Sequence, residues 1–390
     1  MFAIHPPVLA LFRSNAFPGR GRLWVQQGSF FATGALRSQS PVDTVIKWAK
    51  GRNRHKAREI ETTDNKTNPR MAVNLDKVSQ WKTDIALSVD MYNAWFMEFA
   101  PVAFRNTRLK TTIDVEAALK ATDNLTNIKP SLMRLHPEIL PTLRMSTCPP
   151  IAVDRLIGLA GLSPRMVKAM ELYKRLPVRM SVVEADAQLA KIGAIIERLA
   201  DPDIFVWLGR ASPPTEVELH RAATIVADRL CGAVANPIIR NAQEKRQLAA
   251  IKVWLEARGY TPLPGGDGVK FDAMKPGTFS FRLNVPVKLE GGIRQVNIPI
   301  DAVIMPLTAS AGDLPILFEA KSAGDFTNTN KRRKEEALKM AQLRNNYGAK
   351  VRFNLFLCGY FDGGYLGYEA TEGIDWVWEH RIDDLALFGI

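Results

Sequence analysis

The sequence predicts an α/β (α+β) protein in which a mostly helical region precedes a domain built on a mixed β-sheet. Three observations support this prediction. Apolar residues recur at helical spacing between about residues 73 and 235, strand-like segments with period-two alternation follow, and the later elements come in the order αβββαβ. The chain has 390 residues and is 46% hydrophobic, so it can bury two separate cores.

The helical region is expected over residues 71–235. Its first helix carries apolar side chains at helical spacing, which we interpret as a core face: Trp81, Ile85, Val89, Tyr92, Trp95, Phe96 and Phe99. Prolines in Asp201-Pro202 and in Ser212-Pro213-Pro214 mark later breaks between helices.

Residues 154–172 of this region predict a helical hairpin. Gly161 permits a tight turn, and Ser163 can cap a second helix that starts at Pro164. If the hairpin is a DNA-reading helix-turn-helix, its second helix presents Arg165 and Lys168 to a groove. Short helical hairpins are also ordinary packing units, so both interpretations stay open.

The sheet domain is expected over residues 236–390. It should open with a helix that has Asn236 as N-cap, Pro237 at its first position and Gly259 at its end. Further elements follow from periodicity and turn residues: strands at about 279–288, 293–306 and 314–321, a turn at Gly291-Gly292, a helix at 329–347 that ends at Gly348, and a strand at 351–358.

Two short motifs on the expected strands predict a catalytic site. Pro299-Ile300-Asp301 lies on one strand and Glu319-Ala320-Lys321 on the next, and period two places Glu319 and Lys321 on the same face. If the strands pair, two carboxylates and an ammonium converge. Carboxylates are hard ligands for Mg²⁺, which activates water and polarises phosphoryl groups. The motifs therefore suggest a magnesium-dependent phosphodiesterase, although either motif alone is a weak signal.

Glu244 is a candidate fourth member of the site. It lies on the helix before the strands, from which a carboxylate could hold a second metal ion or a water molecule. A surface glutamate paired with Lys245 or Arg240 is an equally good interpretation of the same residues.

A basic segment follows Lys321 and predicts contact with DNA. A polar loop that includes Asn328 leads into Lys331, Arg332 and Arg333 in the first turn of the next helix. The helix dipole disfavours cations at this end, so the placement is easier to understand if the turn meets phosphates. A solvated charge run balanced by Glu335 and Glu336 is the alternative.

The motifs and the element order resemble the PD-(D/E)xK nuclease superfamily. Within it, the segment Phe318–Asn328, the segment Lys331–Ala337 and a block at Leu143–Pro150 with Asp154-Arg155-Leu156 resemble the XamI family of type II restriction endonucleases. The resemblance extends from about Met71 to the C-terminus. It implies Mg²⁺-dependent, sequence-specific hydrolysis of double-stranded DNA, with Asp301, Glu319 and Lys321 as the active-site residues.

The resemblance also implies partners. A methyltransferase would protect the host DNA, and cutting both strands of a palindrome would be simplest for a homodimer. In the expected mechanism Asp301, Glu319 and the carbonyl of Ala320 hold Mg²⁺, and Lys321 positions the attacking water. Two alternatives remain at this stage: a repair or recombination nuclease of the same fold, and a non-catalytic DNA-binding protein.

Residues 1–70 differ from the rest of the chain in charge. They carry 12 basic and 4 acidic side chains, which is +8 of the net charge of +12. They could be a DNA-binding basic tail, an organellar transit peptide, or sequence before a true start at Met71. We favour the last interpretation, because both the resemblance and the first strong helix begin near that methionine.

The remaining composition suggests a cytoplasmic protein without zinc. The three cysteines, Cys148, Cys231 and Cys358, have no metal-ligand spacing. We also expect no apolar segment of transmembrane length, and therefore no association with a membrane.

Overall fold

The computed structural model describes residues 72–288, 295–327 and 329–390, all within one compact unit. Several sequence-based expectations lie outside this part of the chain. They concern residues 1–70, the turn at Gly291-Gly292, Asn328, and the side chains of Lys331 and Arg332.

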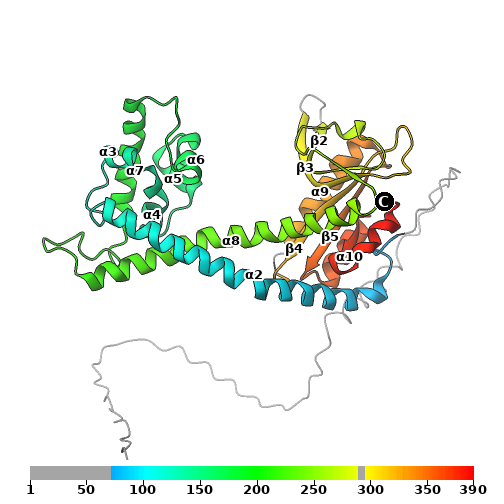
Figure 1. The fold of residues 1–390 in the computed structure, drawn as a ribbon, viewed down its shortest axis with the longest axis horizontal. Coiled ribbons are helices and arrows are strands. Elements are labelled where there is room, and N and C mark those ends of the chain that lie inside the picture. The colour runs from blue at the N-terminus through cyan, green and yellow to red at the C-terminus, as the bar shows by residue number, and fades with distance from the viewer. Residues whose placement is uncertain (1–71, 289–294, 328) are drawn as a thin grey trace, which may run out of the picture. The chain divides into compact units, whose positions relative to one another are not determined.

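The helical region is built around two long helices. Helix α2 (Val78–Ala121) packs along α8 (Glu216–Glu256), and shorter helices pack around them (Figure 1). The shorter elements are α3 (Pro130–Leu135), the 3₁₀ turn η1 (Pro137–Ile139), α4 (Leu140–Met145), α5 (Val153–Ala160), α6 (Pro164–Tyr173) and α7 (Val182–Leu199). Leu140, Leu156, Met166, Leu189 and Val226 are fully buried in their common core.

Helix α8 begins earlier than the sequence predicted. Thr215 and Glu218 form a capping box, in which each side chain accepts a hydrogen bond from the other residue's backbone N–H. Pro237 therefore lies inside the helix, and the expected N-cap at Asn236 was wrong. The proline removes one backbone hydrogen bond, but packing on both sides of it keeps the helix continuous. The expected division at 235/236 falls within this helix.

One apolar stretch of α8 is long enough, by length and composition alone, to cross a membrane. The expectation that no apolar segment reaches this length was therefore wrong. The same helix contributes Ala222, Val226 and Leu230 to the helical core, and Leu248 and Ile251 to the core beneath the sheet. These contacts account for its apolar composition without a membrane, since core helices pass the same test.

The sheet domain has six strands in chain order: β1 (Thr261–Leu263), β2 (Thr278–Lys288), β3 (Gln295–Met305), β4 (Ile316–Ala323), β5 (Arg352–Gly359) and β6 (Asp375–Trp378). Strands β2, β3 and β4 pair antiparallel, whereas β4, β5 and β6 run parallel, as β1 does to β2. The mixed sheet and the order α8-β2-β3-β4-α9-β5 confirm the predicted αβββαβ core.

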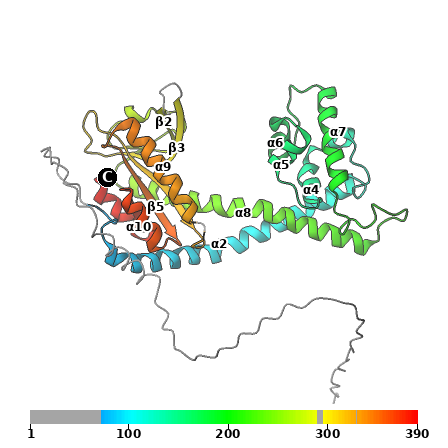
Figure 2. The same ribbon diagram turned by 180° about the vertical axis from the view of Figure 1, so that it is seen from behind.

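Helices cover both faces of the sheet (Figures 1 and 2). Helix α9 (Thr329–Tyr347) and α10 (Gly363–Thr371) pack on one face through residues such as Met340, Leu343 and Leu366. Helix α8 and the C-terminal 3₁₀ segment η3 (Glu379–Phe388) cover the other, and a short 3₁₀ turn, η2 (Phe271–Ala273), precedes β2. The chain thus places α8 and α9 on opposite sides of β4.

Strand β3 does not keep one alternation along its whole length. Ile298 and Ile300 join the core under α9, whereas Ala302 and Ile304 join the core under α8. The change occurs at Asp301, opposite Arg282 of β2, which has a left-handed backbone with φ +52°. Period-two alternation, which the sequence predicted for this strand, therefore fails at Asp301, because the left-handed backbone of Arg282 changes the local twist of the strand pair.

Candidate active site

Asp301 lies where β3 separates from β4. The paired residues of these strands end at Ala302 and Phe318, while β4 continues to Ala323 beside β5. Beyond this point the Ala320 N–H has no backbone acceptor on β3. The Asp301 carboxylate replaces it, since its Oδ2 accepts a hydrogen bond from the Ala320 N–H at 2.9 Å. Because the N–H and C=O of a strand residue point to the same edge, the Ala320 carbonyl also faces this gap.

Glu319 and Lys321 lie on one face of β4, as the sequence predicted. The Lys321 Nζ is 3.2 Å from Glu319 Oε1, and both side chains are largely buried. Gln247 of α8 donates hydrogen bonds to the Lys321 and Phe356 carbonyls, and so fixes this part of β4 against the helix beneath it. The two motifs, 18 residues apart in sequence, therefore meet at one point in the fold.

Two residues of α9 complete the charge network and were missed at the sequence level. Lys321 Nζ lies 3.1 Å from Glu336 Oε1, and Lys339 Nζ lies 2.5 Å from Glu319 Oε1. The Glu336 side chain is fully buried, which contradicts the alternative interpretation of Glu336 as a solvated partner of the basic run. Its spacing of three residues from Lys339 on one helix was the only available signal.

The pKa of Asp301 is raised to about 6, chiefly by burial and then by repulsion from Glu319. The hydrogen bond from Ala320 lowers that pKa and Glu244 raises it further. For Lys321, burial lowers the pKa, but the charges of Glu319 and Glu336 more than offset this effect, so its pKa lies above the usual value. Charge at the site therefore favours a bound cation beside the carboxylates.

A further buried carboxyl group lies behind this network. Glu369 of α10 is fully buried, and burial, followed by repulsion from Glu336 and Glu372, raises its pKa to about 8. Glu369 therefore keeps its proton at neutral pH and adds no negative charge behind Glu336.

The donor atoms fit a hard divalent cation. Glu319 Oε2 is buried and has no hydrogen-bond partner among the described residues, while Asp301 supplies a second carboxylate and Ala320 a carbonyl. Mg²⁺ in proteins commonly uses one or two carboxylates and completes its shell with water. The candidate site offers two carboxylates; the described part of the chain holds no cluster of three or more His, Cys, Asp and Glu side chains arranged as metal ligands.

Glu244 is near the site but is held by another residue. Its Oε1 accepts from Arg282 Nη2 at 2.6 Å and Nε at 3.1 Å. An ion pair with Lys245 or Arg240, which was one of the two interpretations of this residue, is absent from the described structure; Arg282, the residue with the left-handed backbone, is the partner. The charge of Glu244 nevertheless contributes to the raised pKa of Asp301.

The predicted hairpin is present in the helical region. Helix α5 ends at Gly161, whose φ is +58°, and Pro164 opens α6 after Ser163. Ser163 occupies the N-cap position without a capping side-chain hydrogen bond; its N–H donates to Gln188 Oε1 instead. Arg165 and Lys168 are both exposed on one side of α6. The geometry of the hairpin is confirmed, while its use in DNA reading stays a prediction.

The basic turn lies where the sequence placed it. Helix α9 contains residues 331–334 near its start, and the Arg333 guanidinium lies 5.1 Å from the ring centroid of Tyr368. The Arg333 side chain therefore contacts an aromatic ring, whereas the Lys334 side chain is exposed.

Comparisons with known proteins identify the family of the chain. The model of the XamI restriction endonuclease family matches residues 123–378. The type II restriction enzyme SalI of Streptomyces albus G is 54% identical over 317 residues, which cover 81% of this chain and 99% of that enzyme. Protein VC1899 from Vibrio cholerae superposes with a TM-score of only 0.24 at 14% identity, over 66% of this chain and 54% of its own. The chain belongs to the XamI family of restriction endonucleases.

Proposed function

We propose that this restriction endonuclease hydrolyses double-stranded DNA at the site formed by Asp301, Glu319 and Lys321, with Mg²⁺ as its cofactor. The observation that carries the proposal is the convergence of these three side chains where β3 leaves β4. A type II activity also follows from the similarity to SalI over almost the full length of that enzyme.

Asp301, Glu319 and the carbonyl of Ala320 would hold the metal ion. Glu319 Oε2, which lacks a partner in the described structure, is the natural ligand atom of that side chain, because Lys321 and Lys339 already contact Oε1. A bound Mg²⁺ polarises the phosphoryl oxygen and lowers the pKa of a coordinated water.

Lys321 would orient the attacking water and offset charge that develops on the phosphate. Its ammonium is held between Glu319 and Glu336, at 3.2 and 3.1 Å, so its position is fixed before DNA arrives. Glu336 is therefore a positioning residue, and Lys339 would compensate the charge of Glu319. Glu244 is a weaker candidate, because Arg282 occupies its Oε1.

The DNA contacts are proposed on two surfaces. Lys331, Arg332 and Arg333 at the start of α9, with Asn328 before it, follow directly after the catalytic strand and suit backbone phosphates. Arg165 and Lys168 on α6 are proposed to read the target. A homodimer would cut both strands of a symmetric site, and a cognate DNA methyltransferase would be the genetic partner. Both would act in the cytoplasm.

The test compares Asp301→Ala and Lys321→Ala with the wild-type protein in Mg²⁺. Each change removes several kcal/mol of transition-state stabilisation, so the cleavage rate should fall by roughly a thousandfold or more. DNA binding, measured separately in EDTA, should stay largely intact. Lys350→Ala, which removes an exposed lysine from the loop before β5, is the matched control. Cleavage at the wild-type rate by either site variant would refute the assignment.

A further inference from the structure

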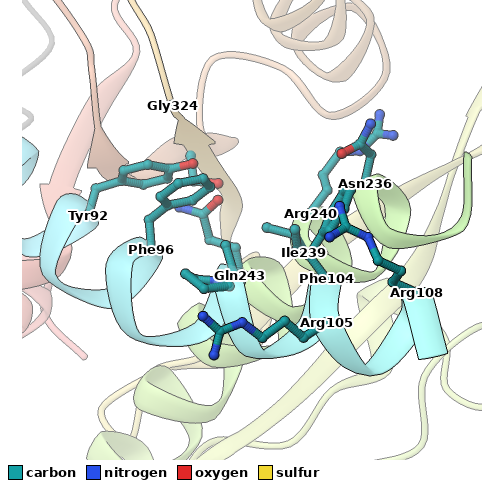
Figure 3. Close-up of a pocket in the computed structure, with 13 residues that line it drawn as sticks. Tyr92, Phe96, Phe104, Arg105, Arg108, Asn236, Ile239, Arg240, Gln243 and Gly324 are labelled. Carbon is teal, nitrogen blue, oxygen red and sulfur yellow. The ribbon is translucent and has the colours of Figure 1, made fainter. Parts of the chain in front are cut away.

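A cavity of about 540 Å³ lies between α2 and α8, next to the end of β4 (Figure 3). Helix α2 contributes Arg105 and Arg108 to its lining, and α8 contributes Arg240 and Gln243. Ser322 and Gly324 close the side nearest the sheet. The cavity is thus formed by three elements that the fold brings together at the catalytic strand.

The charged residues of the lining are all basic. Three arginines line the cavity beside apolar and aromatic side chains, and no acidic residue belongs to the described lining. Arg108 is 3.5 Å from Asp228, an exposed and weak ion pair, whereas Arg105 and Arg240 have no salt bridge within the described structure. Exposed guanidinium groups gathered without carboxylates repel one another, which a bound anion would relieve.

Gln243 provides an independent sign of a ligand. Its side chain is only 4% exposed, yet its Nε2 is buried and has no hydrogen-bond partner within the described residues. An unpaired buried donor costs free energy, and such groups in native proteins usually meet a ligand, water or ion. Because Gln243 lines the cavity, a turn of its amide toward the cavity would let an acceptor bound there satisfy this donor.

The cavity and the candidate active site share two elements, although they share no lining residue. Gln243 precedes Glu244 on α8, and Ser322 follows Lys321 on β4. Arg240 and Glu244 are four residues apart and therefore lie on one face of α8. Gly324 allows close packing at the junction: a Cβ at this position would lie 2.7 Å from the Tyr92 hydroxyl.

We infer that this cavity binds a backbone phosphate of the DNA beside the cleavage site, through the guanidinium groups of Arg105 and Arg240 and the amide of Gln243. The inference rests on the proposed function, because it takes the bound anion to be part of the DNA substrate. Guanidinium groups bind phosphate oxygens through paired, charge-assisted hydrogen bonds, and the Gln243 amide donates one more. Phosphate contacts of this kind would set the register of the DNA relative to Lys321.

The test measures binding of the full chain to a labelled duplex fragment of phage DNA in EDTA, over a series of salt concentrations. Arg105→Ala and Arg240→Ala should each weaken binding roughly tenfold and reduce the salt slope by about one. Arg221→Ala, which removes an exposed arginine from the same helix α8 but outside the cavity, is the matched control and should change neither quantity by as much.

Gln243→Leu separates a ligand-binding role from a structural one. The change removes an unsatisfied buried donor while keeping a similar shape, so the thermal midpoint of unfolding should stay equal or rise. DNA binding should nevertheless weaken. A structural role alone would lower the midpoint and leave the DNA affinity of the folded protein unchanged, which would overturn the inference.

The two proposals can fail separately. If the wild-type protein cuts DNA in Mg²⁺ but the two cavity variants bind DNA like Arg221→Ala, the cavity does not hold a phosphate and only this inference is wrong. The opposite outcome is that Arg105→Ala and Arg240→Ala reduce the salt dependence of DNA binding, while the wild-type protein does not cut DNA in Mg²⁺. The phosphate site is then correct and the proposed cleavage is wrong.

Discussion

The catalytic strand pair and the hairpin of α5 and α6 place charged residues in opposite ways. At the strands, Glu319, Lys321, Glu336 and Lys339 are largely buried and bind one another at 2.5 to 3.2 Å. On α6, Arg165 and Lys168 are exposed, and no ion pair or side-chain hydrogen bond involves them within the described structure. The first region fixes its charges before substrate binds, whereas the second leaves them available.

This difference matches the work each region would do. Chemistry on a phosphate requires groups held in place, since misplacement by about 1 Å can cost a hundredfold in rate. Binding a long polyanion requires charges that can adjust to it, and each contact contributes little alone. In the proposed function, the buried and mutually paired charges form the catalytic centre, and the exposed, unpaired charges of the hairpin form a binding surface.

Within this comparison, the largest effect is expected when the buried carboxylate that holds the Lys321 ammonium is removed. Glu336→Gln keeps the size of the buried side chain but removes the charge that holds the ammonium, so kcat should fall roughly 10- to 100-fold. The neighbouring Glu335→Gln removes the same charge from an exposed position and should leave kcat unchanged. Equal rates for the two variants would show that Glu336 has no positioning role.

The pH dependence of Glu336→Gln distinguishes positioning from a loss of stability. Glu319 and Glu336 together raise the pKa of Lys321, so loss of one partner lowers that pKa and deprotonation begins at lower pH. The alkaline limb of the pH–rate profile should therefore move to lower pH in this variant. A lower rate with an unchanged profile would indicate misfolding alone.

Smaller effects, on DNA affinity, are expected for the exposed basic residues of α6. Arg165→Ala and Lys168→Ala should each weaken DNA binding by about 1 kcal/mol, as measured by titration of duplex DNA in EDTA. Neither should change the rate of cleavage at saturating DNA. Lys191→Ala on the exposed surface of α7 is the control. Affinities equal to that of the control would mean that the hairpin is a packing unit.

The sequence predicted most of the sheet domain because its signals there are local. Period-two alternation and turn residues located β2, β4 and β5, and the spacing within Glu319-Ala320-Lys321 placed two side chains on one face. The start of α6 at Pro164 was also predicted from local residues, the turn at Gly161 and the N-cap position of Ser163. Each of these features depends on residues within one or two turns of the chain.

The start of α8 was missed although its signal is local: Thr215 and Glu218 form a capping box, but Pro237 was taken as the helix start. Other missed features depend on distant contacts. The reversal of alternation at Asp301 requires a left-handed arginine on the neighbouring strand. Glu336 could not be distinguished from Glu335 until α9 was seen packed on the sheet, since burial is decided by that packing.

The site at Asp301, Glu319 and Lys321 is proposed to cut DNA at specific sequences with a divalent metal ion. The most direct measurement is incubation of the purified chain with unmethylated phage DNA, in parallel with Mg²⁺ and with EDTA, followed by gel electrophoresis. Discrete fragments in Mg²⁺ and intact DNA in EDTA are the predicted result. A smear in Mg²⁺ would contradict sequence specificity, and intact DNA under both conditions would contradict the claim as a whole.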